Sequence, residues 1–132
     1  MDNEEKNRKF WTFEDLEICR KAREFRTKIY ELIGQLPAEE KYNLDPQMKR
    51  SAVSITNNIA EGHGRYLSQE NVQFCRQSRG SLKEIIDDLN VCLDEEYFAE
   101  DYINRLKTEG FELLKGINGY IKYLNCRKKE SE

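Results

Sequence analysis

The sequence predicts an all-α protein, an antiparallel up-down-up-down four-helix bundle over residues 12–125. In four separate segments, apolar residues recur at steps of three and four, which is the helical period. Helix start and stop signals separate most of these segments, and none shows the strict alternation of a strand. The chain has 132 residues, of which 38% are hydrophobic. This length and composition suit one domain with one core.

The first predicted helix opens at Thr12, because the segment from Thr12 to Asp15 has the form of a capping box. Pro37 is expected to end it, since proline lacks a backbone donor and restricts the residue before it. The apolar face consists of Ile18, Ala22, Phe25, Ile29, Leu32 and Leu36. Residues 37–44 are expected to form a connection with room for one short turn.

The second predicted helix starts with Asp45 as N-cap and Pro46 at the first helical position. Gly62 and Gly64 are expected to close it, because glycine accepts the left-handed conformation common at helix C-termini. Its apolar face consists of Met48, Ala52, Ile55 and Ile59.

Ser68 is expected to cap the third helix. The third stripe is Cys75, Ser78, Leu82, Ile85, Leu89 and Cys92, and the fourth is Ile103, Leu106, Gly110, Leu113, Ile117, Tyr120 and Leu124. The two stripes are in phase, so the pattern also permits a single helix about 85 Å long. We expect a turn within residues 94–101, because charged residues from Asp94 to Glu96 interrupt the stripe. Residues 1–11 and 126–132 are expected to be frayed polar tails.

Composition narrows the class of protein. Charged residues make up 36%, and 22 basic against 25 acidic residues leave a formal charge of -3, so no overall basic excess indicates nucleic-acid binding. No apolar run is long enough for a membrane span, and the first ten residues lack the apolar core of a signal peptide. The four cysteines, Cys19, Cys75, Cys92 and Cys126, lack zinc-ligand spacing and are expected to be reduced core residues. We expect a cytoplasmic protein.

No motif indicates catalysis. His63, the only histidine, stands between two glycines at a predicted helix end, where an exposed position near the C-terminus is expected. The phosphate-binding loop, the metalloprotease and hydrolase motifs, the EF-hand loop and the bundle di-iron pair are all absent from the sequence. We therefore expect no enzymatic activity, no cofactor and no metal.

A basic face on the first helix is the first candidate site. It comprises Arg20, Lys21, Arg23, Arg26 and Lys28, with Glu24 as the only acid among them. One interpretation is a solvated face whose aliphatic stems cover the core edge. The other is a surface that binds RNA or DNA backbone. No aromatic residue is placed among these positions for base stacking, so such binding would depend on charge rather than sequence.

A polar stripe on the second helix is the second candidate. Arg50, Ser54, Asn58, Glu61 and Arg65 recur at steps of three and four beside the apolar face. Either these side chains form a hydrogen-bond network between helices of one bundle, or they form an interface between subunits. Arg50 and Arg65 could each pair with acids on another helix.

The segment from Lys49 to Arg65, KRSAVSITNNIAEGHGR, resembles the signature of the four-helix-bundle family of 23S rRNA intervening-sequence (S23) proteins. Weaker matches lie from Phe13 to Leu16, at Leu36–Pro37, from Glu40 to Leu44 and from Gly80 to Glu84. The resemblance implies an antiparallel bundle assembled as a ring, with a pentamer as the expected form. It extends to the accessory variability proteins of diversity-generating retroelements, which resemble basic-surfaced pentamers that engage nucleic acid and a reverse transcriptase.

Together these observations predict a non-enzymatic homo-oligomer that binds RNA or DNA backbone through the basic face. The alternative is a structural or protein-docking module whose partner is another protein and which does not bind nucleic acid. No membrane partner is expected.

Overall fold

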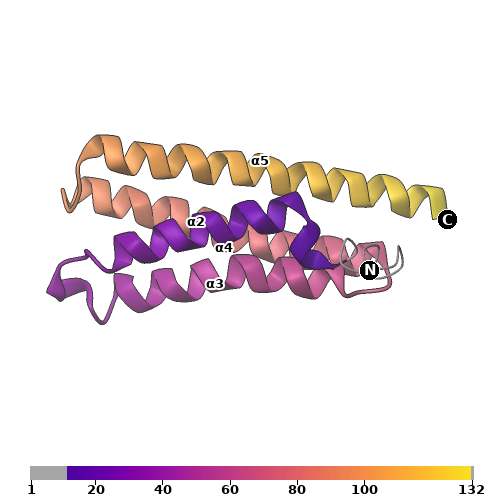
Figure 1. The fold of residues 1–132 in the computed structure, drawn as a ribbon, viewed down its shortest axis with the longest axis horizontal. Coiled ribbons are helices and arrows are strands. Elements are labelled where there is room, and N and C mark those ends of the chain that lie inside the picture. Colours follow the sequence, from indigo (N-terminus) through magenta and orange to yellow (C-terminus); the bar gives the residue numbers. More distant parts are fainter. Residues whose placement is uncertain (1–11, 132) are drawn as a thin grey trace, which may run out of the picture.

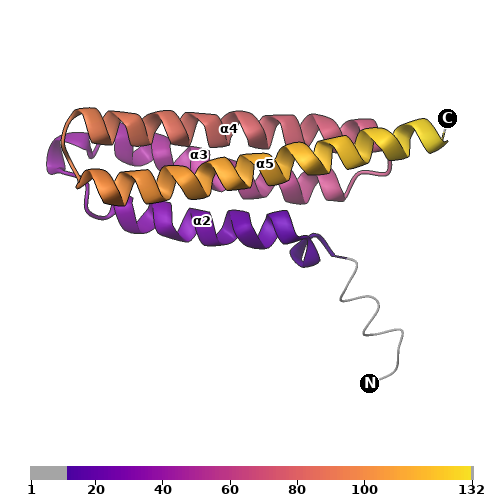
Figure 2. The same ribbon diagram turned by 90° about the horizontal axis from the view of Figure 1, so that it is seen from above.

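A computed structural model describes residues 12–131 of the chain, and the side chains of residues 12–127. The elements in order are η1 (Phe13–Asp15), α2 (Glu17–Ile33), η2 (Ala38–Glu40), α3 (Leu44–His63), α4 (Ser68–Asp94) and α5 (Glu100–Ser131). Four long helices lie side by side, and successive helices run in opposite directions (Figures 1 and 2). Residues 12–131 contain no strand. The predicted all-α bundle is confirmed.

The core lies along the axis of the bundle, where the four apolar stripes meet. Each helix packs on two neighbours. Both α2 and α4 contact α3 on one side and α5 on the other. The large side chains that are less than 2% exposed are Phe25, Ile29, Leu32, Met48, Ile55, Ile59, Leu82, Ile85, Leu89, Ile103, Leu113 and Ile117. All of them belong to the predicted stripes. The heptad spacing therefore identified the buried face of every helix.

The ends of the first helix differ from the prediction. The capping box is present, and the Thr12 N–H donates to the Asp15 carboxylate at 3.4 Å, but it closes only the single turn of η1. Leu16 is extended, so α2 begins at Glu17. The helix ends at Ile33, and further turns separate it from Pro37. The proline follows the helix end and does not cause it.

The start of α3 and its closing glycines need a correction. Asn43 is the N-cap, so the helix begins one residue before Asp45. No glycine among the described residues has a positive φ, and Gly64 at the C-cap is right-handed. The reason for Gly62 is space, because a Cβ there would lie 2.6 Å from Asn71 Oδ1 and 3.0 Å from Phe74 Cβ. Glycine lets α4 approach α3 closely at this position.

The connection between α4 and α5 confirms the predicted turn. After Asp94 the chain forms a Schellman motif, in which the N–H of Tyr97 donates to the Cys92 carbonyl and the N–H of Glu96 donates to the Leu93 carbonyl, both at 3.0 Å. Glu96 takes the left-handed conformation with φ 58°, at the position where glycine is usual. The helix therefore ends in the geometry of a Schellman motif, but without the glycine that usually marks such an end in a sequence.

Two further boundaries differ from the prediction. Ser68 is the first residue of α4, and Leu67 precedes it as the N-cap without a side-chain hydrogen bond. Residues 126–131, predicted to fray, continue α5 as helix to Ser131, and Figure 1 shows the end of α5 extending past the start of α2. The prediction for residues 1–11 falls outside the described residues.

Candidate nucleic-acid interface

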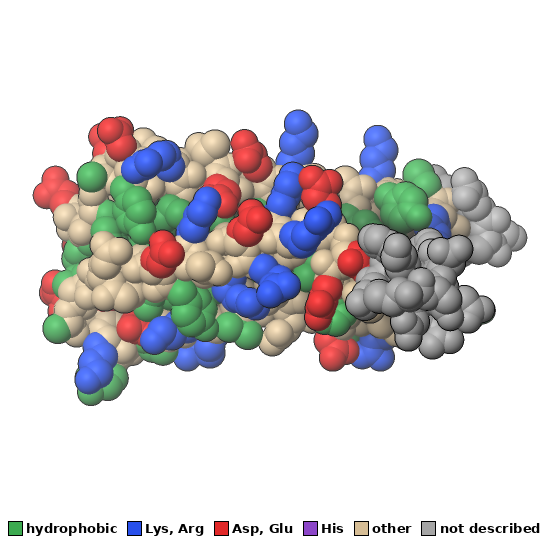
Figure 3. Space-filling view, viewed as in Figure 1, with side chains coloured by type: hydrophobic (Ala, Val, Ile, Leu, Met, Phe, Trp, Pro, Cys, Tyr) green, Lys and Arg blue, Asp and Glu red, His purple; other side chains and the backbone are tan. Residues whose placement is uncertain are grey.

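The basic face predicted on the first helix lies on α2. Arg20, Lys21, Arg23 and Lys28 are exposed, whereas Arg26 is half-buried at the boundary with α3. Figure 3 shows basic side chains on this face of the bundle, interspersed with acidic ones. The face is therefore accessible, and its five side chains differ in what they contact.

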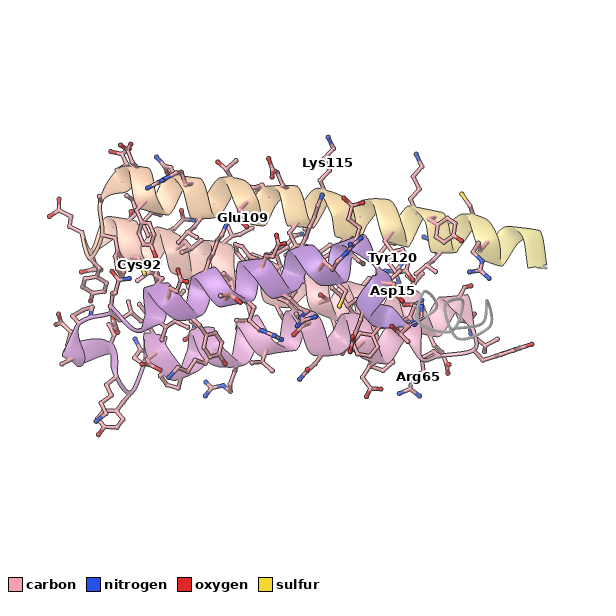
Figure 4. The ribbon with its side chains drawn as sticks, in the orientation of Figure 1. Asp15, Arg65, Cys92, Glu109, Lys115 and Tyr120 are labelled. Carbon is pink, nitrogen blue, oxygen red and sulfur yellow. The ribbon has the colours of Figure 1, made fainter. Side chains whose placement is uncertain are left out.

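Three of the five basic side chains are held by neighbours. Lys21 pairs with Glu17 of its own helix at 3.3 Å. Lys28 bridges to α5, its ammonium lying 2.9 Å from the Glu109 carboxylate, and this hydrogen bond raises the pKa of Lys28 (Figure 4). Arg26 donates from Nη1 to Thr56 Oγ1 of α3 at 2.8 Å. Lys21 therefore pairs within α2, whereas Lys28 and Arg26 link α2 to α5 and to α3.

Arg20 and Arg23 are different. Neither side chain forms an ion pair or a hydrogen bond with the other described residues. Both line one shallow depression of about 310 Å³, which also includes Arg26 and one acid, Glu24. With respect to the described residues, the guanidinium donors of both side chains are available to an external anion.

Two further depressions lie along α2, each sharing a lining residue with the one before, and the described lining of the last includes residues of α3. The next, of about 410 Å³, is lined by Arg26, Thr27, Tyr30 and Glu31. The third, of about 460 Å³, is lined by Tyr30 together with Lys49, Arg50, Val53, Ser54, Asn57 and Asn58 of α3. We call these three depressions the α2–α3 groove. No aromatic residue lies among the five basic positions of α2, but Tyr30, which follows them on the same helix, lines one depression with Arg26 and another with Arg50.

The polar stripe predicted on the second helix divides into three parts. Ser54 lies 2.8 Å from Ser81 of α4, and Asn58 donates to the Ser54 hydroxyl and carbonyl at 2.9 Å, so these two residues form part of a network within the bundle. Arg65, which follows the C-cap of α3, pairs with Glu61 of that helix at 3.3 Å and lies over the Phe74 ring, and no described acid on another helix pairs with it. Arg50 is exposed, and no described side chain pairs with it.

Sequence reasoning missed a polar seam between α3 and α4. Ser51 donates to Glu84 at 3.0 Å, and Gln47 donates to Asp88 Oδ1 at 2.9 Å. Asp88 is only 4% exposed, and its second oxygen has no partner in the described structure. Burial, reinforced by the Asp87 and Glu84 charges, raises the pKa of Asp88 to about 6. The sequence signal for this seam was the step of four residues from Gln47 to Ser51 on α3, matched by the step of four from Glu84 to Asp88 on α4.

Within the described residues, no group of three or more histidine, cysteine, aspartate or glutamate side chains could hold a metal ion. Cys19, Cys75 and Cys92 are buried free thiols, as predicted, whereas Cys126 is an exposed free thiol. Burial raises the pKa of Cys75 and of Cys92 to about 11. Every helix in the described part is too short or too polar to span a membrane.

Comparisons with known proteins extend this description. The model of the 23S rRNA-intervening sequence protein family matches residues 14–119. A solved structure of a protein with unknown function from the S23 ribosomal protein family of Bacteroides thetaiotaomicron VPI-5482 superposes with a TM-score of 0.74 at 23% identity, covering 80% of this chain and 98% of that chain. That similarity shows a shared fold. No curated protein matches the chain. Because the family model covers most of the chain, this protein belongs to the 23S rRNA-intervening sequence protein family.

Proposed function

We propose that this protein is a non-enzymatic, homo-oligomeric bundle that binds RNA or DNA backbone through the basic face of α2. One observation carries the proposal: Arg20 and Arg23 are exposed one turn apart on α2, and their side chains make no ion pair or hydrogen bond with the other described residues. Guanidinium groups match phosphate geometry and remain charged at every physiological pH. Arg26, held by Thr56, provides a third guanidinium at a fixed position beside them.

Assembly would strengthen this binding. A chain with a formal charge of -3 attracts polyanions only through local clusters of basic residues. In a symmetric ring, each subunit presents the same cluster, so several weak contacts act together on one nucleic-acid strand. We propose a pentamer, for which light scattering should give a mass near five times 15.7 kDa. A stable monomer at micromolar concentration would contradict this part of the proposal.

The nucleic-acid part is tested by a salt titration of binding. Replacing both Arg20 and Arg23 with glutamine should weaken binding to a labelled oligonucleotide and flatten the slope of log K against log salt. Each lost phosphate contact is worth about 0.7 to 0.9 in that slope, so the double variant should lose roughly 1.5 per occupied subunit. Arg26 is left intact, because its removal would also break the hydrogen bond between α2 and α3.

The matched control replaces Lys115 and Lys122 of α5 with glutamine. Both lysines are exposed, and Figure 4 shows Lys115 pointing away from the bundle on the outer side of α5. The control removes the same two charges from a different face, so general electrostatic attraction alone would give it the same effect. Equal weakening of both variants would therefore contradict a site on α2.

The second candidate function is a docking module for another protein. It is favoured by the half-buried Val53 and the partly exposed Tyr30, which give the α2–α3 groove an apolar floor. Binding through an apolar surface changes little with salt, whereas backbone binding weakens steeply. A protein partner retained at high salt, together with no retention of oligonucleotide at low salt, would support docking over nucleic-acid binding.

A further inference from the structure

Among the described residues, Tyr30 is the one aromatic residue that lines the α2–α3 groove. Its side chain is 41% exposed, so part of the ring packs against the protein while part faces the groove. Two of the three depressions meet at this residue. No described ring or cation lies over it, in contrast to Tyr42 and Tyr123, which are each covered by a basic side chain. One part of the Tyr30 ring is therefore held by the protein, and the other is open to a flat ligand.

Basic side chains flank this ring on both sides. Arg26 lies beside it on α2, and Arg23 and Arg20 follow along the same helix. Arg50, which forms no ion pair with the described residues, lines the depression on the α3 side. Glu31 is the one acid that lines either of the two depressions meeting at Tyr30. The local charge therefore suits an anionic ligand that extends in both directions from the ring.

The α3 side of the groove also offers neutral polar groups. Asn57 is exposed there, and Asn58 uses its amide nitrogen to bind Ser54, so its carbonyl oxygen is an available acceptor. Amide groups of this kind can bond to the edges of nucleobases. Backbone phosphates alone would not require them.

We propose that the α2–α3 groove binds single-stranded nucleic acid, with one base stacked on Tyr30 and the flanking phosphates at Arg26 and Arg50. This inference rests on the proposed function and specifies its substrate. In a duplex, each base is paired and stacked between its neighbours, so no base face is open to Tyr30. In a single strand, an exposed base can stack on an aromatic ring while cations hold the backbone on either side, which is the usual arrangement in proteins that bind single strands.

The dimensions agree with a short stretch of strand. From Arg20 to Tyr30 the helix rises ten residues, or about 15 Å at 1.5 Å per residue. At the 3.4 Å rise of a fully stacked strand, that length holds at most about four nucleotides, and a more extended single strand would place fewer there. One subunit would therefore hold a few nucleotides.

The experiment compares three labelled probes of roughly 16 nucleotides, a length at the upper end of single-strand site sizes. They are oligouridine, oligodeoxythymidine and an abasic strand with the same number of phosphates. Replacing Tyr30 with leucine should weaken binding of the two base-containing probes roughly tenfold and leave the abasic probe unaffected. Tyr30→Phe keeps the ring and should retain binding. The relative affinities of the first two probes identify RNA or DNA as the preferred ligand.

The matched control is Tyr42→Leu, which makes the same change at an 87% exposed tyrosine outside the groove and should leave all three affinities unchanged. Equal binding of the abasic and base-containing probes, with no effect of Tyr30→Leu, would overturn the inference. If replacing Arg20 and Arg23 still weakened binding in that case, the proposed function would stand without base stacking. Binding of none of the probes would overturn both.

Discussion

The buried carboxyl group of Asp88 should make the stability of this protein fall as pH rises from 4 to 7. Asp88 accepts one hydrogen bond, from Gln47, and its other oxygen is buried without a partner in the described structure. Losing the proton places a charge in this site, whereas in the unfolded chain water solvates the same charge. The folded state therefore holds the proton more tightly, and the pKa of Asp88 is raised to about 6 from 3.8.

The size of the effect follows from the two pKa values. Below about pH 4, Asp88 is protonated in both states and contributes no pH dependence. Between about pH 4 and pH 6 the folded state still holds a proton that the unfolded state has lost, so stability decreases over this range and levels off above it. Raising the pKa of Asp88 from 3.8 to about 6 corresponds to a loss of about 3 kcal/mol of unfolding free energy by pH 7. This is a substantial part of the total stability of a small domain.

Chemical unfolding of the native protein and of Asp88→Asn, at several pH values between 4 and 7, measures this effect. Because asparagine does not titrate, the variant should gain about 3 kcal/mol relative to the native protein between pH 4 and pH 7, whatever its stability at either pH. Asp87→Asn is the control, because Asp87 is exposed and adjacent to Asp88. It should show only a small change, since the Asp87 charge contributes to the raised pKa of Asp88. A constant difference between Asp88→Asn and the native protein would refute the reasoning.

Three further predictions follow from the packing and the turns. Gly62→Ala should lower the free energy of unfolding by about 1 to 3 kcal/mol, because the new Cβ would overlap α4. Gly80→Ala should raise it by about 1 kcal/mol, because a Cβ there meets nothing within 4 Å, and equal effects of the two substitutions in chemical unfolding would contradict this account. Glu96→Gly should stabilise the protein by about 1 kcal/mol by removing the left-handed strain, and a lower melting temperature would show that the Glu96 side chain matters more. Cys126 should react rapidly with a thiol reagent in the native protein, and the three buried cysteines should react only on unfolding; native reaction of all four would show that the core opens.

The four helices could be predicted from the sequence because burial in a bundle imposes a period that one sequence displays directly. The boundaries depended on local geometry, and the prediction was weaker there. Thr12 begins a capping box as expected, but Leu16 interrupts the helix after one turn. The turn after Asp94 uses glutamate at its left-handed position, so no glycine marked it. Gly62 was correctly expected near the end of α3, but for the wrong reason. The glycine is needed for the close approach of α4 and not for a left-handed conformation, and the sequence does not show how closely two helices pack.

The candidate site was predicted only in part. The basic residues of α2 were identified from their clustering, but the sequence does not show which of them have partners. Lys28 meets an acid on α5, more than eighty residues away in the chain, and Arg26 meets a hydroxyl on α3. The position of Tyr30 in the groove also depends on α3, which supplies the opposite wall. Such contacts arise from the way separate helices pack together.

The polar seam between α3 and α4 has a consequence for the alignment of these helices along their common axis. Gln47, Ser51 and Ser54 advance by four and three residues, while their partners Asp88, Glu84 and Ser81 recede by the same steps. Two purely apolar stripes could slide past each other by one helical turn of about 5.4 Å and still bury similar surfaces. Here such a slip would break all three hydrogen bonds at once, and a partner lost by the buried Ser51 or Asp88 would cost about 1 to 3 kcal/mol. The seam therefore favours the sliding position of α3 against α4 in which these three hydrogen bonds form.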